Sequence, residues 1–120
     1  MTKPVTTTHG VVLDPLAADR EMREEPAYAR DGHTARTLVR DRDLRIVLIV
    51  MKAGARIDEH AAEDTASVHV LSGQVRLQLP DRTVDVPAGQ LLVLARGLRH
   101  AVEAARDSAF LLTIGWTPKS

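Results

Sequence analysis

The sequence predicts an all-β domain, a sandwich or a barrel, preceded by a short N-terminal helix. The chain has 120 residues, of which 44% are hydrophobic, and this composition suits one compact domain with a single core. From residue 34 onward, short apolar and β-branched runs recur at regular spacing with turn residues between them, which is typical of all-β domains. The predicted strands cover residues 34–39, 44–51, 66–71, 75–79, 83–86, 91–94, 101–104 and 109–116.

The predicted helix follows from its start signals. Asp14 suits the cap position and Pro15 the first turn of a helix. Residues 16–25 are mostly good helix formers, and the proline that follows them opposes continuation. We therefore expect one short helix, with Leu16 and Met22 facing the body of the domain.

The same signals divide the chain into a lead and a β domain. Residues 1–12 form a polar, threonine-rich segment that we expect to be mobile or draped over a neighbour. We assign residues 1–33 to this lead and the short helix, and residues 34–120 to the β-barrel domain.

Alternation within the strands predicts which side chains share a face. In Val75-Arg76-Leu77-Gln78-Leu79 the three apolar residues fall on one face and the two polar ones on the other. Residues 44–51 and 110–114 instead are apolar on both faces, which is unusual for a half-exposed antiparallel sheet. We expect the N-terminal helix to cover one such face and a second subunit the other, which predicts a homodimer.

Composition argues against several classes of function. Sixteen basic residues balance sixteen acidic ones, so no net charge attracts nucleic acid or an anionic membrane, and neither is an expected partner. There is no cysteine for disulfides, thiolate ligands or a thiol nucleophile. The N-terminus lacks the apolar stretch of a signal peptide, and no run is long enough to span a bilayer. We therefore expect a cytoplasmic protein.

Glycines and histidines recur in the β region in a pattern that resembles the two signature motifs of the cupin superfamily. The matching residues are Gly54, His60 and Gly73 in the first motif, and Gly89, Gly97 and His100 in the second. The resemblance covers nearly the whole chain beyond residue 34. It implies a small single-domain, cupin-like double-stranded β-helix, that is, a jelly-roll barrel.

The departures from these motifs bear on the metal site. In the family, three histidines and one glutamate project from neighbouring strands into the barrel and bind a metal. Alanine replaces four motif residues here: Ala62 for a histidine, Ala66 for the glutamate, Ala95 for a proline and Ala104 for an asparagine. Only His60 and His100 remain, and two imidazoles alone rarely hold a divalent ion firmly. Whether a metal is bound stays open: there is either no cofactor or a weakly held nickel, zinc or iron ion.

Neighbouring side chains offer little replacement for the missing ligands. Glu63 follows His60 in an expected loop, where a solvated acid is the rule. Strand alternation places His69 on the face opposite to Ala66, so we expect it to point away from the cavity. His9 and His33 lie outside the motifs and are expected at the surface.

The remaining site is predicted to be a small apolar cavity with two imidazoles, His60 and His100, at its wall. The expected lining residues are Ile57, Val68, Val70, Leu77, Val93, Val102 and Leu111. Three hypotheses follow: a module that binds a small organic molecule, a metal-dependent dioxygenase or isomerase with a minimal histidine site, and a dimeric interaction module without catalysis. We favour the first; whether the protein is an enzyme stays open.

The sequence contains no further catalytic motif besides the two histidines. The serines lack a nucleophile-elbow context, and no glycine-rich phosphate loop is present. Arg96 and Arg99 flank the second motif, where they either orient an anionic ligand or are surface charge on a turn; we expect the latter.

Overall fold

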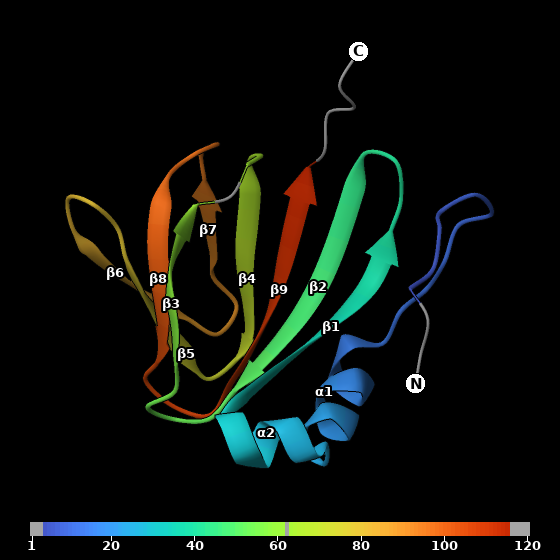
Figure 1. Cartoon of the computed structure of the whole chain (residues 1–120). Coiled ribbons are helices and arrows are strands. Elements are labelled where there is room, and N and C mark those ends of the chain that lie inside the picture. The colour runs from blue at the N-terminus through green and yellow to red at the C-terminus, as the bar shows by residue number, and fades with distance from the viewer. Residues whose placement is uncertain (1–3, 62, 116–120) are drawn as a thin grey trace.

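The computed structural model describes residues 4–61 and 63–115 of the chain. In this part, two antiparallel sheets face each other across a hydrophobic core, and two short helices lie at one end, next to β1 and β2 (Figure 1). The predicted all-β class with an N-terminal helical element is therefore confirmed.

Strands far apart in the sequence are neighbours in both sheets. The five-stranded sheet has the order β1 (His33–Arg40), β2 (Leu44–Met51), β9 (Ser108–Gly115), β4 (Ala66–Ser72) and β7 (Leu91–Leu94). The four-stranded sheet has the order β3 (Arg56–Ala61), β8 (Arg99–Ala104), β5 (Gln74–Gln78) and β6 (Thr83–Pro87).

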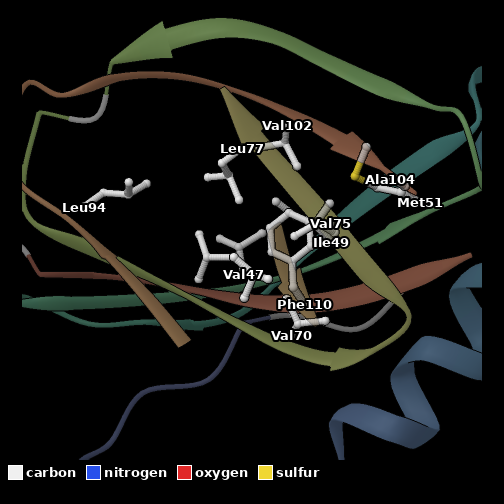
Figure 2. Close-up of a cluster of buried hydrophobic side chains, with 12 residues drawn as sticks. Val47, Ile49, Met51, Val70, Val75, Leu77, Leu94, Val102, Ala104 and Phe110 are labelled. Carbon is white, nitrogen blue, oxygen red and sulfur yellow. The ribbon is translucent and has the colours of Figure 1, made fainter. Parts of the chain in front are cut away.

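Side chains from the inner faces of both sheets form the main core (Figure 2). Its buried members are Val47, Ile49, Met51, Val68, Val70, Val75, Leu77, Val86, Leu94, Val102, Ala104 and Phe110. Phe110, at 1% exposure, is the largest fully buried side chain among residues 4–61 and 63–115. Full burial of a Val, Leu, Ile or Phe side chain is worth about 1.5–3 kcal/mol, so this cluster holds the two sheets together.

All eight predicted strand segments are strands in the structure, with ends that move by at most a few residues. The end of the last one, Trp116, lies outside the described residues. The strand β3 was not predicted, because its sequence Arg-Ile-Asp-Glu-His-Ala is polar and only Ile57 is a large apolar residue.

The helical element is longer than predicted. Helix α1 (Pro15–Arg23) begins as expected: the Asp14 carboxylate accepts a hydrogen bond from the Ala17 N–H at 3.0 Å. A second helix, α2 (Pro26–Asp31), then starts at the proline that was expected to end helical structure. Proline is well tolerated at the first helical position, where its missing N–H needs no partner. Neither helix of the described part is long and apolar enough to cross a membrane.

These helices cover one end of the outer face of the five-stranded sheet. Met22 is fully buried and packs in a cluster with Leu48 and Val50, which point outward from β2. The predicted cover of this apolar face by the N-terminal helix is thus confirmed. Leu16, in contrast, is 53% exposed, so its predicted inward orientation is wrong. Leu16 lies six residues before Met22, and at about 100° per residue the two side chains point about 120° apart around the helix axis.

The polar lead is attached to the chain's own sheet rather than to a neighbour. Val5 forms a parallel bridge to Val39, with its N–H donating to the Leu38 carbonyl and its carbonyl accepting from the Arg40 N–H, both at 3.1 Å. Our expectation of a mobile or intermolecular lead is therefore wrong at Val5, because backbone pairing with β1 anchors it.

Candidate functional site

His60 and His100 lie opposite each other on the neighbouring strands β3 and β8. Their ring centroids are 4.3 Å apart, and the ring planes meet at 62°. Val102, two residues beyond His100, belongs to the main core, so alternation places His100 on the inner face. Because directly paired residues share a face, His60 is on this inner face as well. The structure therefore brings the two predicted site residues together.

A β-bulge gives His60 this orientation. Ile57 pairs with Val102 and packs against the core, yet His60 is three residues further on and would point outward in a regular strand. The register shifts between Ile57 and His60, and Asp58 in the shifted segment has a side chain that is 99% exposed. The extra residue restores the inward direction at His60.

Backbone contacts determine which ring nitrogen is available on each histidine. The Nδ1 atom of His60 lies 3.1 Å from the Asp58 carbonyl oxygen. The Nδ1 atom of His100 lies 3.0 Å from the Leu98 carbonyl oxygen. A carbonyl only accepts, so each Nδ1–H donates. In the neutral ring, the lone pair is then on Nε2, which is free to accept a hydrogen bond from a ligand or to bind a metal ion.

The two histidines differ in depth. His100 is only 4% exposed, whereas His60 is exposed to solvent. One imidazole thus belongs to the interior and the other meets solvent at the same end of the barrel. A ligand that enters from solvent would contact His60 first and reach His100 deeper in.

Apolar residues of the opposite sheet line this end of the barrel. Ala66 begins β4, is 3% exposed, and pairs with Ile114 on one side and Leu94 on the other. Short loops join Ala61 to Ala66 and Leu94 to Arg99, so the rims of both sheets meet at this end. The site is therefore an inner-face row of apolar side chains facing two imidazoles.

The prediction that Val93 and Leu111 line the cavity is wrong. Val93 is 60% exposed and pairs with Ser67, and Leu111 pairs with His69; both pairs lie on the outer face of the five-stranded sheet. The neighbours Leu92 and Leu112 point inward instead and pack against the main core. The error is one of register, because a shift by one residue exchanges the two faces of a strand.

The other histidines do not join the site. His69 is exposed on the outer face, as predicted, and His9 is exposed in a turn. His33 begins β1 and is half-buried, with its Nδ1 atom inaccessible to solvent and without a hydrogen-bond partner among the described residues. Its expected surface position is therefore wrong, because α2 and β1 pack together at this point.

The charged residues around the second motif are paired on the outside. Arg96 contacts Asp64 at 3.3 Å, and Arg99 contacts Glu59 at 2.5 Å, with all but Asp64 largely exposed. Glu63 is exposed in the loop before β4, as expected. The predicted role of the two arginines as surface charge is thus supported, since an acid neutralises each of them.

Comparison with known families agrees with the signature residues. The family model described as "Cupin domain" matches residues 47–115, which is more than half of the chain and includes His60 and His100. The chain belongs to the cupin domain family. A search among curated proteins gives no match.

Solved structures show the same fold as this cupin. A conserved protein of unknown function from Streptococcus pyogenes is 28% identical, with a TM-score of 0.75, over 99% of this chain and 98% of the other. An RmlC-like cupin from Desulfovibrio desulfuricans is 24% identical, with a TM-score of 0.67, over 77% and 90%. A single-residue variant of oxalate decarboxylase from B. subtilis is 25% identical, with a TM-score of 0.67, over 75% of this chain and 27% of that larger one. The predicted jelly-roll fold is confirmed.

The donor set of this cupin does not fit the family's metal site. Among residues 4–61 and 63–115, no group of three or more His, Asp or Glu side chains comes together closely enough to hold a metal ion. Ala66, in place of the glutamate, is buried on the inner face and has no donor atom. Ala62, in place of the second histidine, has none either, and its placement is outside the described residues. The two imidazoles therefore lack the partners that would complete the family's set of ligands.

Proposed function

We propose that this cupin binds a small organic molecule at the open end of its barrel, in contact with His60 and His100. The observation that carries the proposal is the pair of imidazoles on the inner face, whose Nδ1 atoms are both occupied by backbone carbonyls. Both Nε2 atoms are then available next to an apolar wall. A concave apolar surface with a few convergent polar groups is the usual form of a small-molecule site.

A ligand screen by thermal shift tests this proposal. A ligand at a hundred times its Kd stabilises the native state by about 2.7 kcal/mol, which is roughly 10 °C for a domain of this size. We expect the stabilisation to be lost in His60→Ala, with His69→Ala as the matched control, because His69 is an exposed strand histidine on the outer face. A shift that persists in His60→Ala and His100→Ala would contradict the proposal.

The same variants decide between binding and metal-dependent catalysis. Elemental analysis of protein purified without a metal-affinity tag, before and after addition of nickel, zinc or iron, measures the metal content. Near-stoichiometric metal that disappears in both His60→Ala and His100→Ala would favour a dioxygenase or isomerase with a minimal site. We expect substoichiometric metal, because open catalytic sites usually keep three protein ligands.

We further propose that a second copy of the chain covers the rest of the outer face of the five-stranded sheet. Leu91 and Val93 on its edge strand β7 are 58% and 60% exposed. Val12, on the loop before α1, is 98% exposed. Leu91 and Val93 are thus an exposed apolar pair at one edge of the sheet, and a two-fold symmetric dimer buries such a patch against the same region of its copy.

Sedimentation at micromolar concentration tests the dimer. We expect a dimeric mass for the unaltered protein and a monomeric mass for the double variant Leu91→Lys, Val93→Lys. Leu16→Lys is the control, because Leu16 is comparably exposed but lies on α1. A monomeric mass of the unaltered protein would overturn the proposal.

A further inference from the structure

Arg45 is a charged residue on the inner face of the barrel. It is the second residue of β2, whose sequence Leu-Arg-Ile-Val-Leu-Ile-Val-Met contains no other polar side chain. The residues at alternate positions after it, Val47, Ile49 and Met51, all belong to the main core. Arg45 therefore points to the same side as the core, at the end where β2 begins.

This arginine lacks a compensating group. Its Nε atom is inaccessible to solvent and has no hydrogen-bond partner among residues 4–61 and 63–115, and no carboxylate of these residues forms a salt bridge with it. Its direct cross-strand partner is Arg40, a second cation. The nearby Asp41 carboxylate accepts hydrogen bonds from the Thr7 N–H and hydroxyl instead. Arg45 as a whole is half-buried, so the cost of an unpaired donor falls on its Nε–H, and the like charge opposite it adds to that cost.

The position of Arg45 links it to the two histidines. Arg45 pairs with Ile114, which pairs with Ala66, so these residues form one row across β2, β9 and β4. At a strand spacing of about 4.8 Å, the row from Arg45 to Ala66 is about 10 Å long. The loop between β3 and β4 joins the Ala66 end of this row to the His60 end of the other sheet. The guanidinium and both imidazoles therefore occupy the same end of the barrel interior.

We infer that Arg45 binds the carboxylate of a small hydroxy acid whose hydroxyl groups donate to Nε2 of His60 or His100. The inference rests on the proposed ligand site and names the class of ligand. A guanidinium is permanently charged and holds a carboxylate through two parallel hydrogen bonds. An imidazole with an occupied Nδ1–H accepts at Nε2, which suits a hydroxyl and does not suit a second carboxylate. The guanidinium of Arg45 and the two Nε2 acceptors thus match one carboxylate and neighbouring hydroxyls.

NMR titration with pairs of acids and neutral analogues tests the inference. The probes are gluconate against glucitol and lactate against 1,2-propanediol, so that each pair differs at the carboxylate. The Arg45 Nε–Hε resonance reports on the guanidinium, and the imidazole resonances of His60 and His100 report on the proposed ligand site. We expect an acid to shift both sets and its neutral analogue to bind at least ~10-fold more weakly, since hydrogen bonds to charged groups are the strong ones.

Variants separate this role from a structural one. Arg45→Gln should weaken acid binding at least ~10-fold and leave neutral binding unchanged, and Arg45→Lys should lose part of the affinity because it lacks the planar fork. Arg20→Gln is the matched control, because Arg20 is an exposed arginine on α1, away from the inner face. Without ligand, Arg45→Met should raise the melting temperature, because it removes the uncompensated charge. A purely structural arginine would give the opposite shift.

The outcomes are distinguishable. Equal affinity for acids and neutral analogues, or unchanged acid binding in Arg45→Gln, would overturn the role of Arg45 while the ligand site stands. Acids that shift the Arg45 resonance but not those of His60 and His100 would overturn the proposed ligand site and keep the anion site. If inorganic phosphate binds at Arg45 as tightly as either acid, the assignment to hydroxy acids is wrong.

Discussion

Replacing Gly73 with alanine should unfold this domain far more easily than the same change at Gly89. Gly73 forms the tight connection between β4 and β5 and has φ +76°, a left-handed conformation. The neighbouring Ser108 hydroxyl accepts a hydrogen bond from the Gln74 N–H at 3.0 Å and donates to the Arg106 carbonyl at 2.7 Å. The hydrogen bonds of the buried Ser108 hydroxyl therefore hold this turn in close contact with the start of β9.

The magnitude follows from two terms. A Cβ atom at Gly73 would lie 2.8 Å from Ser108 Cα and closer still to the Asp107 carbonyl oxygen, so backbone must move. Overpacking of this kind costs about 1–3 kcal/mol, and the left-handed conformation adds about 1–2 kcal/mol for a residue with a side chain. Gly89 has φ +86° but no atom within 4 Å of the same Cβ, so it carries only the second term. We expect a loss of ~3 kcal/mol at Gly73 and ~1 kcal/mol at Gly89.

Urea unfolding followed by circular dichroism measures both losses. The slope of the free energy against urea should be the same for both variants, so that the midpoint alone reports the change in stability. Thermal midpoints should fall by roughly 12 °C and 4 °C respectively. Equal losses in Gly73→Ala and Gly89→Ala would refute the steric reasoning, because both glycines share the left-handed conformation and only Gly73 is crowded.

Three further predictions concern the site, the helix and the lead. His100→Ala should lower the free energy of unfolding by about 1–3 kcal/mol, because it removes a buried, hydrogen-bonded ring. His60→Ala should lower it by less than about 0.5 kcal/mol, because His60 is exposed. Urea unfolding of both variants measures these losses. Met22→Ala should lose about 2–5 kcal/mol through a cavity between α1 and β2, against less than about 0.5 kcal/mol for the exposed Leu16→Ala, in the same assay. Hydrogen bonds from the lead hold the pKa of Asp41 below its ordinary value of 3.8. The hydrogen bonds from Thr7 to Asp41 should therefore persist above pH 3.8 and be lost as the pH falls through the lowered pKa, while the backbone pairing of Val5 stays in place. The amide chemical shift of Thr7 measures this change, and Asp41→Asn should remove its pH dependence.

Much of this fold could be predicted from the sequence because burial repeats every second residue along a strand. Val75 and Leu77 are fully buried while Arg76 and Gln78 are exposed, as their alternation indicates. The turn glycines were informative for a similar local reason, since a left-handed backbone favours a residue without a side chain. Each of these signals depends only on residues close together in the chain.

The site was predictable only in part. The motif positions identified His60 and His100, but the strand that carries His60 was not predicted, since its residues are mostly polar. A bulge is a property of two paired strands, so β3 alone does not show that His60 faces inward. Arg45 was missed, although a lone arginine in the apolar run of β2 was an available signal. Its significance depends on which face of β2 is buried.

The sequence by itself determined every strand of the described residues except β3, together with the turns and the two histidines, because alternation and turn chemistry are local. Only the tertiary structure decided that both imidazoles share one inner face 4.3 Å apart, that both Nδ1 atoms are occupied, and that Arg45 lies at the same end of the barrel. These facts depend on the pairing of β3 with β8 and of β2 with β9. Such pairings join segments roughly 40 to 70 residues apart, and they are set by the shared core rather than by any one segment.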